Sequence, residues 1–398
     1  MCAAVVLLLA AATGSSCLAE GILVDPVAGY RGVYFNPQLN ADPNYPWLLN
    51  YLACRSQVQT ALKELRTTAG VNLVDVFVMI PNTLKQPARG NLPGEPLEAW
   101  ANTDYLNNVC TFIEDCRAER IWVEVDLADN RWVPATIDPK HHIGSPNSKW
   151  WPTADAEPWK ASAEWYAQVI NYVESHLDHP QSIAYWCMMG NYVHGAAEPL
   201  LWDSVEPHEL IIWTERFIKA VWPAFCRAGK RPKAAPIMLP ILSGSSYWRN
   251  KSVADRLSGM HNLQRWLVKD LKMPPDYWIM TTYPNCDPAP DGTCYIREVL
   301  KIIGLRNAHK LISTDLKGIG HEHEVRDSII GVSQQTGAQM LKWHLSKCRE
   351  YGLGGWWMWA YQDTPIEKWG LRTVDGAWKK ELLEVLKQYS NPNTSIVN

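Results

Sequence analysis

Short apolar runs alternate along the chain with longer stretches in which apolar residues recur at every third or fourth position. The short runs predict buried strands, and the three-to-four spacing predicts amphipathic helices. Trp165, Val169, Tyr172 and Val173 show this helical spacing, because they would share one helix face. The predicted strands cover residues 32–36, 73–80, 121–127, 183–189, 236–242, 277–283, 310–316 and 354–360. The predicted helices cover residues 47–67, 104–118, 158–178, 207–228, 253–271, 294–308, 328–351 and 376–389.

Strands that alternate with helices imply right-handed βαβ units and a parallel sheet. Eight such units predict an α/β fold, a single-domain (β/α)₈ TIM barrel spanning residues 20–398. A doubly wound open sheet is the alternative, but no Gly-rich phosphate loop follows the first strand. The longest insertion, 128–157, follows the third strand, and loops of that length tend to be functional.

Residues 1–19 predict a signal peptide. An apolar run from Ala3 to Ala12 is followed by small residues and a possible cleavage site after Ala19. The run is too short to span a bilayer and fits the core of a signal peptide. We therefore expect a secreted or periplasmic protein with no membrane span.

Charge and aromatic composition narrow the choice of partner. The chain carries 38 basic and 41 acidic residues without a long run of either sign. This balance argues against nucleic acid or an anionic membrane as the main partner, and we expect a monomer. The chain has 21 Trp beside only 5 Phe, which favours flat amphipathic faces at a surface that stacks sugar rings. A Trp-heavy core without a ligand is the alternative.

The cysteines and histidines predict disulfides rather than a metal centre. In an oxidising compartment some cysteines should pair, and Cys286 and Cys294 flank the loop "NCDPAPDGTC". Cys187 lies inside an apolar run and is expected to be a buried thiol. No C-x-x-C pair exists, and His321 and His323 of "GHEHE" cannot complete a ligand set alone. No metal or cofactor is expected.

The active site of such a barrel lies at the carboxyl ends of its strands, which converts the predicted strands into candidate site residues. These positions are rich in carboxylates, amides and indoles, groups that suit an uncharged ligand dense in hydroxyls. They include Asn36, Asp126, Asp129, Asn130, Trp132, Asn191, Tyr192, His194, Tyr283, Asp315, Trp357 and Trp359.

Five short motifs follow one another in strand order: "YRGVYFN", "MMGNY", "TTYP", "LISTDLKG" and "GGWWMWAYQD". In this order they resemble the cellulase-like glycoside hydrolases of clan A, whose barrels place one Glu after strand four and another at strand seven. The resemblance implies that Asn191 contacts a sugar 2-hydroxyl and that Tyr283 supports the nucleophile. It implies further that Asp315 takes the nucleophile's place and that Trp357 or Trp359 is the sugar platform.

The chain also departs from that family's pattern. Tyr192 stands where the family carries its acid, and Asp315 is one methylene shorter than the expected nucleophile. No Arg follows the second strand, and Thr281 stands where a His is common. The acid of a glycosidase is therefore missing from its usual place.

Glycoside hydrolysis needs two carboxyls across the scissile bond, one of them protonated. Asp315 is the candidate for the ionised member. Asp129 is the leading candidate for the acid, because it follows the third strand beside Asn130 and Trp132; a turn-capping role is its alternative. Glu124 is expected to point into the barrel, where burial would raise its pKa and suit it to an acid, or make it hydrogen-bonded core.

These residues predict a secreted glycoside hydrolase-like protein that acts on a polysaccharide or oligosaccharide. A non-catalytic carbohydrate-binding barrel is the rival prediction, and a metal hydrolase is a third with few histidines to support it. Tyr192 is a poor acid but could hold a hydroxyl or stack on a ring, and His194 could donate a proton. The first two predictions differ in whether a second carboxyl comes near Asp315.

Overall fold

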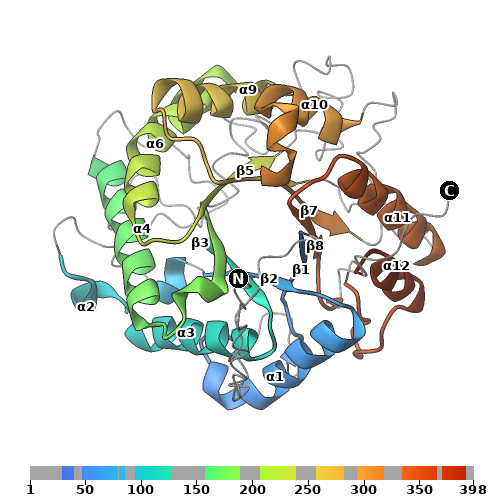
Figure 1. Ribbon diagram of the computed structural model, residues 1–398. Helices are drawn as coiled ribbons and strands as arrows, with labels where there is room; N and C mark the ends of the chain where they lie inside the picture. The colour runs from blue at the N-terminus through green and yellow to red at the C-terminus, as the bar shows by residue number, and fades with distance from the viewer. Residues whose placement is uncertain are drawn as a thin grey trace, which may run out of the picture.

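A computed structural model describes residues 29–39, 47–78, 80–85, 95–127, 157–188, 207–238, 257–281, 294–317, 334–364 and 370–390. Eight parallel strands pair in sequence order, and the last pairs with the first to close a barrel. Figure 1 shows the helices as a ring around these strands. The prediction of a (β/α)₈ barrel is therefore confirmed.

The strands are β1 Tyr30–Tyr34, β2 Leu73–Phe77, β3 Trp122–Leu127, β4 Ile183–Met188, β5 Lys233–Met238, β6 Tyr277–Thr281, β7 Leu311–Lys317 and β8 Gly355–Trp359. The main helices are α1 Tyr51–Thr68, α3 Thr103–Ala118, α4 Glu157–His176, α6 Pro207–Arg227, α9 Ser258–Gln264, α10 Tyr295–Ile303, α11 Gln334–Glu350 and α12 Lys380–Ser390. The described part also contains a four-residue helix, α2, at Leu97–Trp100.

All eight predicted strands form, but some of their ends differ from the prediction. β1 begins at Tyr30 rather than 32, and β5 begins at Lys233, three residues before the predicted start at 236. The charge of Lys233 interrupts the apolar pattern that marks a strand, yet its side chain is buried. The predicted helix over 253–271 is α9 followed by a π-helical segment, Arg265–Asp270.

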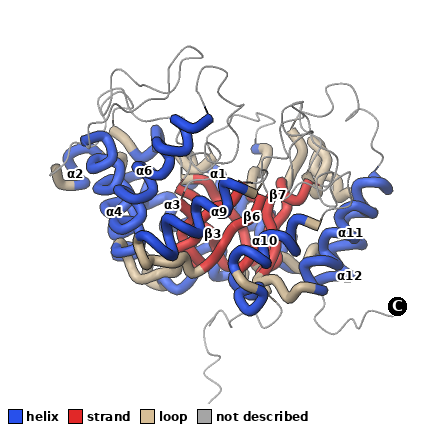
Figure 2. The backbone as a smooth tube through the Cα atoms, turned by 90° about the horizontal axis from the view of Figure 1, so that it is seen from above, coloured by secondary structure: helices blue, strands red, loops and turns tan. Residues whose placement is uncertain are grey.

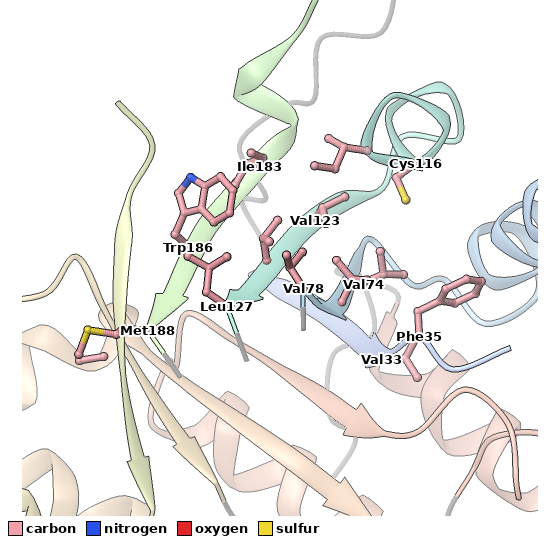
Figure 3. Packing of buried hydrophobic residues seen from close by; sticks show 14 of the residues in the cluster. Val33, Phe35, Val74, Val78, Cys116, Val123, Leu127, Ile183, Trp186 and Met188 are labelled. Carbon is pink, nitrogen blue, oxygen red and sulfur yellow. The ribbon is translucent and has the colours of Figure 1, made fainter. Parts of the chain in front are cut away.

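The outward-facing side chains of the strands form the larger core. Val74, Val123 and Ile183 point away from the barrel axis and pack with helix residues such as Cys116 of α3 (Figure 3). Burial of this apolar layer against the helices is the main stabilising force for the barrel wall.

Aromatic rings close the amino-terminal end of the barrel interior. Tyr30, Trp122 and Tyr277 are the first residues of their strands. The ring of Tyr30 meets Trp122, Tyr185 and Tyr277 edge-on, with ring centroids 6.1, 5.8 and 6.0 Å apart. These side chains fill the amino-terminal end of the barrel interior in the described part of the chain.

Two glycines make room for this interior. A Cβ on Gly32 would lie 2.6 Å from Cβ of Trp357, and one on Gly355 would lie 2.6 Å from Cβ of Tyr30. Both contacts are far below van der Waals distance. The glycines of "YRGVY" and "GGWWMW" are therefore required by the large side chains beside them.

The cysteines differ from their prediction. Among the described cysteines the structure contains no disulfide. Cys294 is a thiol there, and Cys286 lies outside the described residues, so the predicted pairing of these two is not observed. Cys187 is buried, as predicted. The helices that the structure describes include none that is both long and apolar enough to cross a membrane.

Candidate functional site

Carboxyl groups line one side of the barrel interior. Asp75 on β2 pairs in register with Glu124 on β3, and Glu124 pairs in register with Tyr185 on β4. Neighbouring strands lie about 4.8 Å apart, so inward side chains at paired positions are in contact range. Asp75 is fully buried and Glu124 is 1% exposed. Asp126, two residues along β3 from Glu124, is half-buried.

Glu124 is held in its protonated form at neutral pH. Burial is the main cause and raises its pKa to about 8, and the nearby charge of Asp126 acts in the same direction. Hydrogen bonding from Tyr185 and Trp357 opposes part of this rise. The Tyr185 hydroxyl donates to Oε2 of Glu124 at 2.5 Å. Glu124 therefore carries a proton inside the barrel, below its carboxyl-terminal mouth.

The thiol of Cys187 shows that the carboxyls form one cluster. Burial raises its pKa well above the usual value, and the charges of Asp126, Glu124 and Asp75 raise it further. Cys187 also pairs in register with Asp126. We call Asp75, Glu124 and Asp126 the interior carboxyl cluster. Like charges so close together cannot all ionise, which is a second reason why a proton stays on the cluster.

Stacked aromatic rings lie at the carboxyl-terminal ends of strands β1, β2 and β8. Figure 2 shows the strands in the middle of the molecule with helices on either side. Tyr34, at the end of β1, stacks on Trp359, at the end of β8, with ring centroids 4.1 Å apart and planes 8° from parallel. Phe77 of β2 packs against the other side of Tyr34 at 4.5 Å. All three rings are half-buried. Phe77 also packs against Trp359, with ring centroids 5.7 Å apart, so the three rings form one aromatic group at the mouth.

The two predicted platform residues on β8 lie at different depths. Trp357 is 6% exposed and belongs to the buried cluster inside the barrel. Trp359 lies one inward position nearer the mouth, and its peptide bond to Ala360 is cis. Of these two, Trp359 is the ring that a ligand at the mouth can reach.

Asp315 lies at an irregularity in β7. The register with β8 shifts between Ser313 and Leu316, so Thr314 and Asp315 together oppose the single residue Trp357. Such bulges are frequent next to active sites, where they redirect a side chain. Ser313, just before the bulge, bonds Nε2 of the buried His344 on α11 at 2.8 Å. Burial lowers the pKa of His344 to about 3, so its ring is neutral.

Asn36 joins the two strands that close the barrel. Its side-chain nitrogen donates to the carbonyl of Gln362 at 3.0 Å, and its side-chain oxygen accepts from the Gln362 amide at 3.1 Å. The carboxamide therefore fixes the end of β1 to the segment after β8. A contact of Asn36 with a ligand stays a prediction.

The other predicted site residues lie outside the described residues. Their roles stay predictions. These residues are Asp129, Asn130, Trp132, Asn191, Tyr192, His194 and Tyr283.

Three residues of the interior and the mouth were not among the candidates from sequence. Asp75 lies inside the apolar run "LVDVF", and Phe77 and Tyr34 occupy the last inward positions of their strands. Alternation along the strand could have found Asp75, because residues two apart on a strand point to the same side. Leu73 points into the barrel, so Asp75 does too. Among the described side chains, no group of His, Cys, Asp and Glu could hold a metal ion.

Solved structures share this fold along nearly the whole chain. The beta-glycosidase from the hyperthermophile Thermosphaera aggregans matches with a TM-score of 0.60 and 14% identity, over 92% of this chain and 96% of that one. Fpglu1 from Fervidobacterium pennivoraus matches with a TM-score of 0.60 and 13% identity, over 91% of this chain and 95% of that one. GH5_18 from Streptomyces cattleya, in complex with GlcNAc, matches with a TM-score of 0.59 and 12% identity, over 92% of this chain and 82% of that one.

No protein-family model matches the chain, and no curated protein matches it in sequence. Identities of 12–14% establish a shared fold. The resemblance to clan A glycoside hydrolases is therefore confirmed at the level of the barrel.

Proposed function

We propose that the protein is a glycoside hydrolase that acts on an oligosaccharide or polysaccharide at the carboxyl-terminal mouth of the barrel. One observation carries this proposal: the interior carboxyl cluster reaches the mouth on β3, and Asp315 lies on β7. In the closed strand order these two strands are four positions apart in either direction, so they face each other across the barrel. Glycoside hydrolysis requires two carboxyl groups, and each of these two strands supplies at least one carboxyl-bearing residue.

Asp315 acts as the nucleophile or base in this proposal, and the acid comes from the side of β3. Asp129, in the loop after β3, remains the leading candidate for the acid. Glu124 holds a proton at neutral pH but is almost fully buried and bonded to Tyr185. Asp126 lies about 6–7 Å nearer the mouth than Glu124, given the rise of two residues along a strand. It is the third candidate, because the cluster can pass it a proton.

Sugar binding rests on the aromatic rings of the mouth. A half-buried indole at the mouth suits the apolar face of a pyranose, and stacking on Tyr34 fixes the orientation of the Trp359 ring. The Streptomyces cattleya protein of the same fold was solved with GlcNAc, which supports a hexose as the unit recognised. The apolar run at residues 3–12 supports export of the protein, so the substrate would be met outside the cytoplasm.

A carbohydrate-binding barrel without catalysis is the second candidate. The observation that favours it is Tyr192, which follows Asn191 where the related motif carries its acid. In that case the platform of Trp359 and Tyr34 binds the sugar, and the interior carboxyl cluster serves only to hold the barrel together. Without a protonated carboxyl at the scissile bond, the transition state gains nothing over the bound substrate.

Release of reducing ends from a panel of plant and algal polysaccharides tests the proposal, with binding to the same panel measured alongside. Hydrolysis by the parent protein supports a glycosidase. Binding without release supports the second candidate and overturns the first. With a cleaved substrate in hand, Asp129→Asn, Asp126→Asn and Glu124→Gln identify the acid, because its loss should cost about 10²–10⁴-fold in rate.

A further inference from the structure

A cavity of about 360 Å³ opens at the amino-terminal end of the barrel, the end opposite the proposed active site. It lies between the turn that leads into β5 and the segment that leads into β6. A volume of this size is at the lower end of the range for small-molecule sites. Its lining residues are Cys226, Gly229, Lys230, Arg231, Pro232, Lys233, Met273, Pro274 and Asp276.

The turn on one side of the cavity is held firmly by α4. Glu174 accepts from the backbone amides of Lys230 and Arg231 at 2.5 and 3.1 Å, and Asn171 accepts from the amide of Gly229 at 2.8 Å. Gly229 has a φ of +59°, and a Cβ there would collide with the Glu174 carboxylate at 2.2 Å. The wall of the cavity is therefore preorganised, which lowers the entropic cost of binding a ligand.

Lys233 supplies a buried positive charge to the cavity. Its side chain is 4% exposed, and Nζ lies 5.9 Å from the centre of the Phe225 ring. Nζ donates one hydrogen bond, to the carbonyl of Arg231 at 2.5 Å. An ammonium group has three donors, and within the described part of the chain this one makes a single hydrogen bond. The carboxylates of Glu174 and Asp276 act on Lys233 through their charge, but neither forms a salt bridge with it among the described residues. A buried ammonium group with unused donors is costly, so an anion in the cavity that accepts from Nζ would stabilise it.

The remaining charges around the cavity favour an anion as well. Arg231 lines the cavity and uses Nε to donate to the carbonyl of Ile183 at 2.9 Å, which fixes the guanidinium beside it. Lys230 adds a third, exposed cation to the lining. Asp276 is the one acidic residue of the lining, and it accepts from the backbone amide of Lys233 at 2.8 Å. Cations therefore outnumber carboxylates in the lining by three to one.

We propose that this cavity binds a small organic anion, with its carboxylate or phosphate group held by Lys233 and Arg231. Arg and Lys form charge-assisted hydrogen bonds with both groups. Met273, Pro232 and Pro274 provide apolar surface for the rest of the ligand. The site is separate from the carboxyl-terminal mouth, so its ligand is not the sugar substrate.

Isothermal titration of the full-length protein with succinate and with inorganic phosphate, at constant ionic strength, tests this site. We expect at least one anion to bind saturably with a dissociation constant below about 1 mM. The anion that binds more tightly distinguishes a carboxylate site from a phosphate site. Lys233→Met, which keeps the stem and removes the charge, should weaken binding by about tenfold or more.

Lys269→Met is the matched control, because Lys269 is exposed and outside the lining; its dissociation constant should stay within about twofold of the parent's. If circular dichroism shows that Lys233→Met fails to fold, Arg231→Met takes its place with the same expected loss. Absence of saturable binding by both anions overturns the proposal. Equal affinity in the parent and in the folded variants overturns it too, whatever the outcome for sugar hydrolysis.

Discussion

Two tyrosines of β1 pack in different ways at the two ends of the barrel. Tyr30, the first residue of β1, is 5% exposed and meets three other aromatic rings edge-on. Tyr34, the last residue of β1, is half-buried and stacks flat on Trp359. Edge-on packing fills the amino-terminal end of the interior, whereas the stacked and half-buried pair lies at the carboxyl-terminal end. The closed end therefore stabilises the fold, and the proposed sugar site lies at the open end.

The interior carboxyl cluster lies between these two ends. Below it the rings of the closed end exclude water, and above it Asp126 is already half-buried. This gradient explains why Glu124, the deeper carboxyl of β3, keeps a proton with a pKa of about 8. A barrel interior that is dry at one end and open at the other can hold a protonated carboxyl close to a site that needs one.

The largest effect should come from removing the ring at the closed end. Tyr30→Ala should lower the free energy of unfolding by about 3–5 kcal/mol, because it empties a fully packed layer. Tyr34→Ala should cost only about 1–2 kcal/mol, since its ring is half-exposed. Urea unfolding of both variants makes the comparison, and equal losses would show that the two ends do not differ.

The next effect concerns the proton on Glu124. Its pKa is about 8 in the folded chain against an ordinary value of 4.5, so the native state binds a proton that the unfolded chain releases. The contribution of Glu124 to the free energy of unfolding should be largest below about pH 4.5. It should fall as the pH rises toward about 8. Glu124→Gln should flatten this dependence in urea unfolding between about pH 5 and 8.

Glu384→Gln, on the exposed face of α12, is the control for the loss of a carboxyl. It should leave the dependence of stability on pH as in the parent. A Glu124→Gln variant with the parent's pH dependence would show that Glu124 is ionised in the folded protein, and would remove it as a proton store.

A smaller effect is expected at the platform. Trp359→Ala should weaken sugar binding by about tenfold, the equivalent of one lost stacking contact. Trp359→Phe keeps an aromatic face and should lose less. Tyr30→Ala, as far as it folds, should keep the parent's affinity, because the closed end does not contact the ligand. A loss of affinity at Tyr30 equal to that at Trp359 would break the division between the two ends.

The last effect concerns Asn36 and is similar in size to that at the platform. Asn36→Ala removes both bonds to the Gln362 backbone and should lower the free energy of unfolding by about 1–2 kcal/mol. Gln38→Ala, which removes one side-chain bond to the carbonyl of Asn36, is the milder control. An Asn36→Ala variant that loses sugar affinity beyond about twofold would assign Asn36 to the ligand, as the sequence predicted.

The strand order, the barrel and the outward core could be predicted from the sequence, because apolar runs and helical spacing repeat eight times. The start of β5 could not, because a buried Lys233 breaks the apolar pattern that marks a strand. The inward direction of Glu124 followed from its alternation with valines, but its bond to Tyr185 depends on the register of β3 and β4. The stacking of Tyr34 on Trp359 joins residues at opposite ends of the chain, which no local pattern reveals.

The central claim is hydrolysis that depends on the strand-seven carboxylate, and the most direct measurement compares Asp315→Asn with the parent on one cleaved polysaccharide. Initial rates of reducing-end release should fall by about a thousandfold or more, while affinity for the polysaccharide stays within about twofold. An Asp315→Asn variant that cleaves at the parent's rate would contradict the account, because the carboxylate of β7 would then have no part in the reaction.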